Sequence, residues 1–335
     1  MTLKVAINGF GRIGRLVLRA IAEQKRQDLQ VVAINDLADV DSNAYLLRYD
    51  SVHGPAPFEV KSAGQTLDVG LGSIQVFAES HPEKLPWKDL DIDVVMECSG
   101  RFTSRDAAAK HLTAGAKRVL ISAPADHVDH TVVFGVNHKT LTAHHIVVSN
   151  ASCTTNCLAP VAAVMHDAFG IEHGYMTTIH AYTGDQRLVD TFHTDPRRAR
   201  SAALSMIPTS TGAARAVGLV LPELKGKLDG TAIRVPTPNV SLVDFKFVTK
   251  KHTTNEEINE AVMKAATNAL KGVLGTVHEP LVSSDFNHNP LSSVFDLSQT
   301  QVIGGRFCRI LSWYDNEWGF SNRMSDTAVV MGRFL

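Results

Sequence analysis

The stretch "KVAINGFGRIGRLVLRA", residues 4–20, decides the fold of the first half of this chain. A short apolar run leads into Gly9, Gly11 and Gly14, which have the spacing G-x-G-x-x-G. In this pattern the first glycine turns tightly, the second lets the backbone approach a pyrophosphate, and the third lets helix and strand pack closely. The helix that follows offers free N–H groups and a partial positive charge. The stretch predicts a dinucleotide site, while the plainer interpretation is an ordinary strand–helix turn.

The next predicted strand supplies a carboxylate at a suitable distance. It runs over residues 30–36 and ends in Asn35-Asp36, after a stretch whose apolar residues recur at helical spacing. A carboxylate about 20 residues beyond the glycines accepts hydrogen bonds from the adenosine ribose. Because an acidic side chain also repels a 2′-phosphate, Asp36 predicts NAD rather than NADP as the cofactor.

Six short runs in the first 150 residues are rich in β-branched side chains and predict strands. They cover residues 3–9, 30–36, 91–100, 117–124, 131–137 and 145–152. Their near-continuous apolar character is typical of strands covered on both faces, as in a parallel sheet. Since parallel strands are joined by right-handed crossovers, we expect an α/β fold with a Rossmann-type, doubly wound sheet.

The second half has a different pattern. Residues 211–221 predict a helix, and residues 253–272 predict another that opens with a capping box from Thr254 to Glu257. Residues 241–249 alternate apolar and polar side chains, which is typical of an antiparallel strand with one covered face. These patterns favour an α+β domain with an antiparallel sheet.

The change of pattern places a domain boundary near residue 150. We expect an NAD-binding domain over residues 1–150 and a catalytic domain over residues 151–317. A C-terminal helix at about residues 318–335 is a candidate to pack back on the first domain.

Composition excludes several classes of function. The chain has 335 residues, 44% of them apolar, which is enough for two cores. Its 33 lysines and arginines balance 34 aspartates and glutamates, so no charge excess predicts a nucleic-acid or membrane surface. No apolar run reaches the ~18 residues of a membrane span. Cysteines at positions 98, 153, 157 and 308 make no disulfide framework, and we expect a reducing, cytoplasmic setting.

The stretch "SNASCTTNCLAP", residues 149–160, contains two cysteines four positions apart. On a helix their Cβ atoms would lie about 6 Å apart, which is too far for an unstrained disulfide. A zinc site would need two further ligands at metal-site spacing, and we expect no metal. Cys153 falls where a helix would begin, which stabilises a thiolate. It is therefore a candidate nucleophile, with a structural thiol as the alternative, and Cys157 has the pattern of a buried structural thiol.

A thiol nucleophile also needs a base. His180 ends an apolar, β-like run over residues 175–180 and is the histidine with the best context. A lone histidine there is commonly a satisfied buried imidazole. Paired with a thiol at a helix start, it could lower the thiol pKa and then shuttle protons.

Several later residues are suited to anions. Thr211 and Gly212 precede a predicted helix, whose start is a ready-made anion site. The run RRAR at 197–200 and Arg234 add guanidinium groups, which bind phosphate through two parallel N–H···O hydrogen bonds. The alternative for RRAR is a solvated face or a salt-bridge cluster between subunits. Together these residues favour a small phosphorylated substrate.

These stretches resemble the phosphorylating glyceraldehyde-3-phosphate dehydrogenases. The matching motifs, in the order of that family and across essentially the whole chain, are AINGFGRIGR, SNASCTTNCLAP, HAYTGDQR, RRARSAA, IPTSTGAA, LPELKGKLDGTAIRVPTPNVS and SWYDNEWGFSNR. The resemblance implies a glycolytic-type, NAD-dependent oxidoreductase that acts on glyceraldehyde 3-phosphate and inorganic phosphate. It also implies a homotetramer.

The resemblance assigns a role to each candidate residue. Cys153 attacks the aldehyde to give a thiohemiacetal, and His180 activates the thiol and assists proton removal. Hydride passes to NAD, which leaves a thioester that inorganic phosphate attacks. The residues implied at the cofactor are Gly9, Gly11, Arg12, Ile13, Gly14, Asp36, Ser80, Ser122 and Asn316. Those implied at the substrate phosphate are Thr183, Asp185, Arg198 and Arg234. Those implied at the attacking phosphate are Ser152, Thr154, Thr211 and Gly212.

Some positions depart from the family pattern. Ser80 stands where many relatives carry arginine near the adenine, and Phe320 replaces a common tyrosine beside the nicotinamide. Thr191-Phe192 stands where NAD-specific relatives often have Leu-Pro, although Asp36 still favours NAD. Two other functions stay open. One is erythrose-4-phosphate dehydrogenase, against which the stretch TSTG at 209–212 argues, and the other is an NAD-binding scaffold without turnover.

Overall fold

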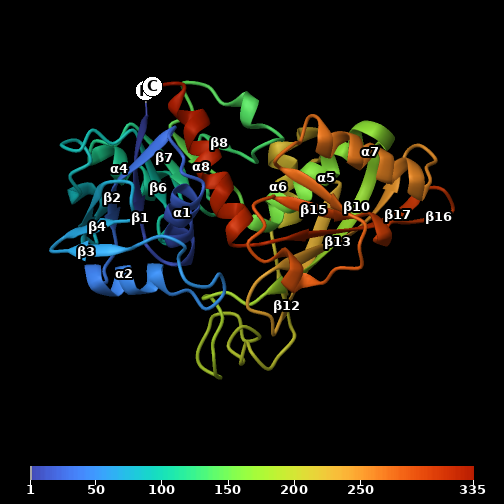
Figure 1. Ribbon diagram of the computed structural model, residues 1–335. Helices are drawn as coiled ribbons and strands as arrows, with labels where there is room; N and C mark the ends of the chain where they lie inside the picture. The colour runs from blue at the N-terminus through green and yellow to red at the C-terminus, as the bar shows by residue number, and fades with distance from the viewer. Residues whose placement is uncertain (1) are drawn as a thin grey trace. The chain divides into compact units, whose positions relative to one another are not determined.

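The computed structural model describes residues 2–335. They form two compact units, one of residues up to Ser152 together with Ser321–Leu335, and one of Cys153–Phe320. Each unit is built around its own sheet (Figure 1). The described helices include none that is both long enough and apolar enough to cross a membrane.

The first unit contains a nine-stranded sheet in the order β3-β4-β5-β2-β1-β6-β7-β9-β8. Its strands are β1 (Leu3–Asn8), β2 (Leu29–Asn35), β3 (Lys61–Ala63), β4 (Thr66–Asp68), β5 (Ser73–Phe77), β6 (Val94–Glu97), β7 (Arg118–Ile121), β8 (His130–Thr131) and β9 (Val147–Ser149). All pairings from β5 through β8 are parallel, whereas β3 and β4 form an antiparallel hairpin at one edge. The predicted Rossmann-type parallel sheet is confirmed.

Three details of this sheet differ from the sequence-based prediction, and the first is that β5 was not among the predicted strands. The hairpin β3–β4 was not predicted, because its short polar strands carry no apolar signal. The prediction of a strand over 131–137 is wrong beyond Thr131, where the chain turns instead. The Asn137 side chain accepts the Val133 N–H at 2.8 Å and donates to the Thr131 carbonyl at 2.8 Å. The apolar run reflects burial of Val133 within this turn rather than strand pairing.

Helices complete the first unit. They are α1 (Arg12–Glu23), α2 (Val40–Arg48), α3 (Arg105–Ala108), α4 (Lys110–Thr113) and α8 (Trp318–Gly332), of which α8 belongs to this unit from Ser321 onward. The red C-terminal helix in Figure 1 is bound by Arg26, which pairs with Asp326 at 2.6 Å, and by Thr327, which donates to Asn150 at 2.8 Å. The last residues of the chain therefore pack in the same unit as the first.

The second unit contains an eight-stranded, mostly antiparallel sheet in the order β11-β12-β10-β13-β17-β15-β14, with β16 paired to β17. Its strands are β10 (Ile171–Ala181), β11 (Ile207–Ser210), β12 (Leu228–Val235), β13 (Ser241–Thr249), β14 (Leu274–Val277), β15 (Ser293–Asp296), β16 (Gln301–Ile303) and β17 (Phe307–Tyr314). The alternation in β13 is confirmed, since Val243, Phe245 and Phe247 are buried. Two pairings, β10–β12 and β14–β15, are parallel.

Three helices pack against this second sheet. They are α5 (Cys153–Phe169), α6 (Ala213–Val220) and α7 (Asn255–Thr267). Helix α5 contacts β10, β13, β15 and β17 and continues through Pro160. The capping box of Thr254 and Glu257 is present at the start of α7, which ends at Thr267, before the predicted end at Gly272. Short 3₁₀ helices occur at Pro82–Lys84, His138–Thr140, Pro222–Leu224, Ser283–Phe286 and Leu297–Gln299.

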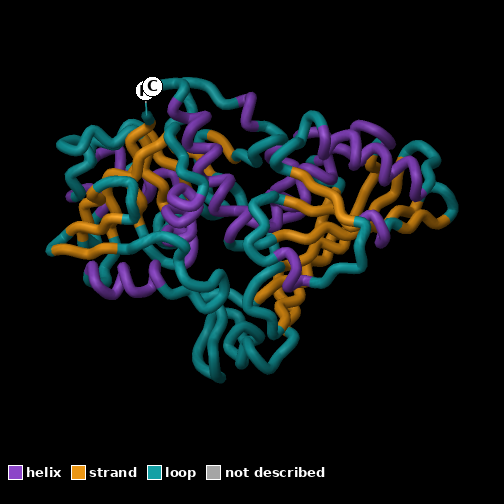
Figure 2. Tube along the Cα trace, viewed as in Figure 1, coloured by secondary structure: helices purple, strands orange, loops and turns teal. Residues whose placement is uncertain are grey.

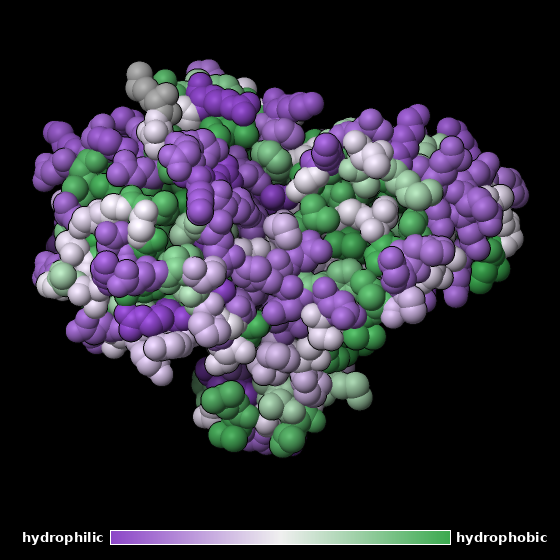
Figure 3. Space-filling model, viewed as in Figure 1, coloured by the Kyte–Doolittle hydropathy of each residue, from purple (hydrophilic) through white to green (hydrophobic). Residues whose placement is uncertain are grey.

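A long loop over residues 182–206 joins β10 to β11 without a helix or strand of its own (Figure 2). Large hydrophobic side chains gather on this yellow-green loop of Figure 1 (Figure 3). Leu188, Phe192, Leu204 and Met206 are each between 75% and 85% exposed. Exposed apolar side chains gathered in this way are typical of interaction sites.

Candidate active site

The glycine-rich turn of the first unit requires its glycines for two different reasons. Gly9 has a φ of +87°, and a Cβ there would lie 2.4 Å from the backbone of Ser99. A Cβ at Gly14 would lie 2.1 Å from the carbonyl oxygen of Gly9. Gly11 faces open space instead, since a Cβ added there would meet no atom within 4 Å. The first and third glycines are therefore needed for packing, and the second leaves the backbone bare toward a cavity.

That cavity has a volume of about 270 Å³ and is formed within the first unit. Its lining is Asn8, Gly9, Gly11, Asn35, Asp36, Leu37, Glu79, Ser80, Cys98, Ser99, Arg101 and Phe102. Helix α1 begins beside it with Gly11 as N-cap, with no side-chain cap and no acidic residue in its first turn. Bare N–H groups at a helix start suit a pyrophosphate, so these residues fit a dinucleotide.

Asp36 is held at the edge of the cavity by backbone donors. Its Oδ2 accepts the Phe10 N–H at 2.7 Å, and its Oδ1 accepts the Ala38 N–H at 3.0 Å. The carboxylate keeps further lone pairs for ribose hydroxyls. The position of Ser80 in the cavity lining and the half-buried Phe102 complete the end that suits adenosine.

The remaining candidate cofactor residues are spread over both units. Arg12 is engaged by Asp50, with Nη1 to Oδ2 at 2.5 Å. Ile13 lies in the first turn of α1, and Ser122 donates its N–H to the Glu97 carbonyl at 2.9 Å. Asn316 lies in the second unit, where its Oδ1 accepts the Ser241 hydroxyl at 2.8 Å. Since Ser241 uses the oxygen of this amide, the amide nitrogen is the end that a ligand can meet.

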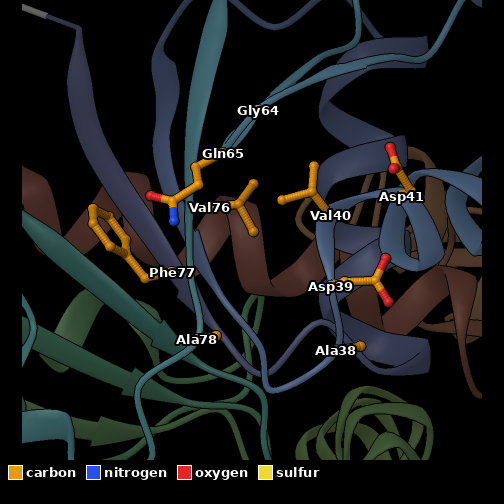
Figure 4. A pocket seen from close by; sticks show the side chains of 9 residues that line it. All are labelled: Ala38, Asp39, Val40, Asp41, Gly64, Gln65, Val76, Phe77 and Ala78. Atoms are coloured by element: carbon orange, nitrogen blue, oxygen red, sulfur yellow. The ribbon is translucent and has the colours of Figure 1, made fainter.

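A second hollow of the first unit contains none of the candidate residues. It lies between the start of α2 and the β4–β5 region, lined by Val40, Gln65 and Phe77 among others (Figure 4). Its carboxylates already have partners, because Asp39 caps α2 through the Ser42 N–H and Asp41 accepts the Ser62 hydroxyl. None of the glycines of the turn lines this hollow, so it is not part of the cavity described above.

The thiol and the imidazole come together in the second unit. Helix α5 begins at Cys153, just after Ala151, whose φ of 56° makes the turn out of β9. His180 lies at the C-terminal end of β10. The Sγ atom of Cys153 is 3.6 Å from Nε2 of His180. The Cys153 residue as a whole is partly exposed.

The hydrogen bonds of His180 determine which ring nitrogen faces the thiol. Nδ1 lies 2.7 Å from the carbonyl oxygen of Ala181. Arg234 Nη1, which can only donate, lies farther from Nδ1, at 3.2 Å, so the shorter contact with the carbonyl, which can only accept, assigns the proton to Nδ1. Arg234 donates from Nη1 to the same carbonyl at 3.1 Å. Nε2 therefore presents its lone pair to Cys153, which is the arrangement of a general base.

Burial is the largest influence on the pKa of both Cys153 and His180. It raises the pKa of the Cys153 thiol, and the positive charge of Arg234 works in the opposite direction. Burial, assisted by Arg234, lowers the pKa of His180 to about 3. The free protein thus holds a neutral thiol beside a neutral imidazole. The sequence had favoured a thiolate at this helix start, and burial of the sulfur accounts for the difference.

Cys157 is a structural thiol in this arrangement. It is fully buried one turn along α5, with its Sγ 3.4 Å from the Ser293 hydroxyl. Burial raises its pKa to about 12. All four cysteines are free, and within residues 2–335 no three histidine, cysteine, aspartate or glutamate side chains gather where they could hold a metal ion.

The guanidinium and hydroxyl candidates lie beside the imidazole. Arg234 pairs in register with His180 across β10 and β12, and its Nη1 donates to the Thr183 hydroxyl at 3.2 Å. Its Nε is buried and has no hydrogen-bond partner among the described residues. A buried guanidinium N–H without a partner is suited to an anion. Arg198 is held by Asp185, with Nη1 to Oδ2 at 2.6 Å.

The second set of anion candidates lies at helix starts. Gly212 is the N-cap of α6, and the Thr211 hydroxyl accepts the Ala213 N–H at 3.2 Å. Thr154 lies in the first turn of α5, where its hydroxyl is 2.8 Å from the hydroxyl of Tyr314. Ser152 is the last residue of its stretch in the first unit, directly before Cys153.

Sequence reasoning missed several residues that support these groups. Thr209 accepts Arg198 Nε at 3.0 Å and donates to Asp195 at 2.9 Å. Tyr314 is buried and joins the hydroxyls of Thr154 and Thr178, at 2.8 and 2.9 Å. Neither residue was assigned a role, because its hydrogen-bond partners are distant in sequence.

A Rossmann-type unit, a thiol–imidazole pair and nearby guanidinium and hydroxyl groups together define a class, the nicotinamide-dependent dehydrogenases that work through a cysteine. Comparisons with known proteins narrow this class. Residues 3–105 match the family described as glyceraldehyde 3-phosphate dehydrogenase, NAD binding domain, and residues 152–316 match its C-terminal domain.

Full-length relatives agree with that match. A glyceraldehyde-3-phosphate dehydrogenase of Xanthobacter flavus is 68% identical over 333 residues, covering 99% of each chain. Those of Cereibacter sphaeroides and Geobacillus stearothermophilus are 66% and 56% identical, covering 100% and 98% of each chain. The chain belongs to the glyceraldehyde-3-phosphate dehydrogenase family. It is an NAD-dependent phosphorylating dehydrogenase of that type, so the predictions of family, enzyme class and cofactor are confirmed.

Proposed function

We propose that the chain oxidises D-glyceraldehyde 3-phosphate to 1,3-bisphosphoglycerate through a thiohemiacetal and a thioester on Cys153. The observation that carries this proposal is the 3.6 Å approach of Cys153 Sγ to His180 Nε2, with the Nδ1 proton committed to Ala181. In that arrangement the ring can accept one proton from the thiol side and return it later.

The steps follow from these two side chains. His180 takes the thiol proton as Sγ bonds to the aldehyde carbon, and it returns that proton to the new alkoxide, which gives the thiohemiacetal and leaves the ring neutral. NAD supplies the hydride acceptor for the oxidation. His180 accepts the hydroxyl proton as the C–H hydride leaves, which yields the thioester. Phosphate then attacks the carbonyl, the C–S bond breaks, and the departing sulfur recovers a proton from His180.

Two anion sites are proposed for the two phosphate groups. Arg234, Thr183 and Arg198 would hold the substrate phosphate, with Asp185 orienting Arg198. The buried Arg234 Nε without a partner supports this site. The attacking phosphate would use Ser152, Thr154, Thr211 and Gly212, since α6 begins with its N–H groups free of acidic neighbours. Separate sites are needed because one phosphate stays on the substrate while the other attacks.

The cofactor assignments extend the same proposal. The first unit would hold the adenosine and pyrophosphate of NAD through the glycine turn, Arg12, Ile13, Asp36, Ser80 and Ser122. Asn316 would hold the nicotinamide amide, because its amide nitrogen is the end left for a ligand. The first unit then serves as the NAD-binding domain and the second as the catalytic domain.

A homotetramer in the cytoplasm completes the proposal. The exposed Leu188, Phe192, Leu204 and Met206 support burial of the long loop against another copy of the chain. Gln186 in the same loop is buried with both amide atoms unpaired within the described chain. Four free thiols suit a reducing compartment. Sedimentation equilibrium should give the tetramer mass, and a monomer at micromolar concentration would contradict this part.

The decisive experiment compares initial rates of NAD reduction on glyceraldehyde 3-phosphate and erythrose 4-phosphate, with and without inorganic phosphate. We expect phosphate-dependent turnover that favours the triose. Phosphate-independent turnover on the tetrose would indicate erythrose-4-phosphate dehydrogenase. NAD binding without turnover on either aldehyde would indicate a scaffold.

A further inference from the structure

A hydrogen-bonded chain of buried side chains underlies the cavity of the first unit. At one end the Glu79 N–H donates to Asn35 Oδ1 at 2.9 Å. Asn35 Nδ2 donates to Asn8 Oδ1 at 2.7 Å, and Asn8 Nδ2 donates to Glu97 Oε2. Because a backbone N–H can only donate, the direction of each bond in this half is determined.

The other half of the chain reaches Glu97 from the opposite side. Trp87 Nε1 donates to His111 Nδ1 at 3.0 Å, and His111 Nε2 lies 2.9 Å from Glu97 Oε2. An indole N–H can only donate, so Nδ1 is an acceptor and Nε2 carries the proton. His111 is therefore the neutral tautomer that donates to Glu97. Both rings are fully buried.

Glu97 consequently accepts hydrogen bonds from both halves of the chain of side chains. Its Oε1 also accepts the Ser99 N–H at 2.8 Å and the Ser99 hydroxyl. The side chain is 1% exposed, and no lysine or arginine of the described chain forms an ion pair with it. Four converging donors require an acceptor-only group, which is the carboxylate anion.

This carboxylate connects the strand ends that form the cavity floor. Glu97 ends β6, Asn8 ends β1 and Asn35 ends β2. The Ser99 backbone that it anchors is the surface against which Gly9 packs without a Cβ. A backbone that must approach a pyrophosphate closely has to be held to within about 0.5 Å. Asn8 bonds to both Asn35 and Glu97, and Glu97 is the group that holds Asn8 and the Ser99 backbone together.

We propose that Glu97 is a positioning residue for the dinucleotide, and that Trp87 and His111 support it by locking a single tautomer. The inference rests on the proposed use of this cavity for NAD. Glu97 does not touch the cofactor. It sets the places of Asn8 and Ser99, which line the cavity.

The sharpest variant is Glu97→Gln, because its size is preserved while its NH₂ group brings a donor to a point where donors already converge. We expect the dissociation constant of NAD, measured by fluorescence titration, to rise about tenfold. The loss should appear in KM for NAD and leave KM for the aldehyde unchanged. Val119→Ala is the matched control, because Val119 is buried in the same unit but packs with Ala108, Ile121 and Val147 and makes no hydrogen bond to Glu97 through its side chain. It should lower Tm without changing NAD affinity.

Trp87→Phe tests whether the indole N–H holds His111 in a single tautomer. Two-bond ¹H–¹⁵N spectra, with the His111 signal assigned by its loss in His111→Gln, should show Nδ1 as the bare nitrogen in the wild type. In Trp87→Phe that single-tautomer pattern should be lost and NAD should bind several-fold more weakly. Should Glu97→Gln fail to fold, Ser99→Ala removes the hydroxyl donor to Glu97 while keeping the backbone N–H, and it should also weaken NAD binding.

Two results would overturn the inference: wild-type NAD affinity in a folded Glu97→Gln or Ser99→Ala variant, or a His111 signal with protonated Nδ1. A wild-type chain that fails to bind NAD would instead overturn the proposed function, so the two failures are distinguishable.

Discussion

Cys153 and His180 are 27 positions apart in sequence, yet their Sγ and Nε2 atoms lie 3.6 Å apart, with the ring turned so that its bare nitrogen meets the sulfur. The helix start of α5 and the strand end of β10 bring them together within one unit. This relationship places a proton acceptor directly beside the thiol.

Replacing the sulfur should abolish turnover. Cys153→Ser leaves a hydroxyl that is a far weaker nucleophile, so we expect kcat for NAD reduction to fall by at least about 10⁴-fold. The measurement is absorbance of NADH with saturating aldehyde and phosphate. Cys157→Ser is the matched control and should retain most of its turnover, because that thiol is buried and contacts Ser293. Full activity in Cys153→Ser would refute the thioester route.

Removing the charge of Arg234 should change the pH dependence of thiol alkylation. Arg234 lowers the pKa of Cys153 against the larger opposing effect of burial. In Arg234→Met that pKa should rise, so the iodoacetamide rate profile should shift to higher pH and the rate at pH 8 should fall several-fold. Arg215→Met removes an exposed charge that pairs with Asp229 and should leave the profile unchanged.

Substitutions of the first two glycines of the turn should have different effects on Tm and on NAD affinity. Gly11→Ala places a methyl in open space, so we expect wild-type Tm but NAD affinity at least about tenfold weaker, because the pyrophosphate loses close backbone approach. Gly9→Ala forces a Cβ against Ser99 and should lower Tm as well. Equal NAD affinity in Gly11→Ala and the wild type would contradict the assignment of this cavity.

Neutralising Asp36 should relax the choice of cofactor. Asp36→Asn keeps the shape of the side chain and an acceptor, but it removes the charge that repels a 2′-phosphate. We expect the ratio of kcat/KM for NADP to that for NAD to rise about tenfold. Asp39→Asn, which preserves a good N-cap on α2, should leave the ratio unchanged. An unaltered ratio in Asp36→Asn would assign the selectivity to other residues.

The Arg12–Asp50 pair should contribute to acid stability. Burial disfavours the Asp50 anion, but Arg12 and the N–H groups of His53 and Val52 outweigh it and lower the pKa to about 2. The stabilisation is complete above the ordinary value of 3.8 and is lost as pH falls toward 2. Asp50→Asn should therefore cost about 2 kcal/mol at pH 7 and flatten the dependence of Tm on pH below 4. Equal Tm values at pH 7 would contradict this.

Much of the fold was predictable because its signals are local. The glycine spacing, the apolar runs of β1, β2, β6 and β7, and the capping box of α7 each depend on a few adjacent residues. The strand expected beyond Thr131 was wrong because Asn137 folds its side chain back onto the backbone. That bond competes with sheet pairing and leaves no mark on an apolar pattern.

The sequence by itself determined where a thiol, an imidazole, a glycine turn and the carboxylate after β2 would occur, because strand ends and helix starts are set by neighbouring residues. Only the tertiary structure decided the partners of those groups. The bare nitrogen of His180 depends on the Ala181 carbonyl, and the state of Glu97 depends on an indole donor that acts through His111. Burial and hydrogen-bond direction arise when distant segments exclude water together, and no local pattern encodes them.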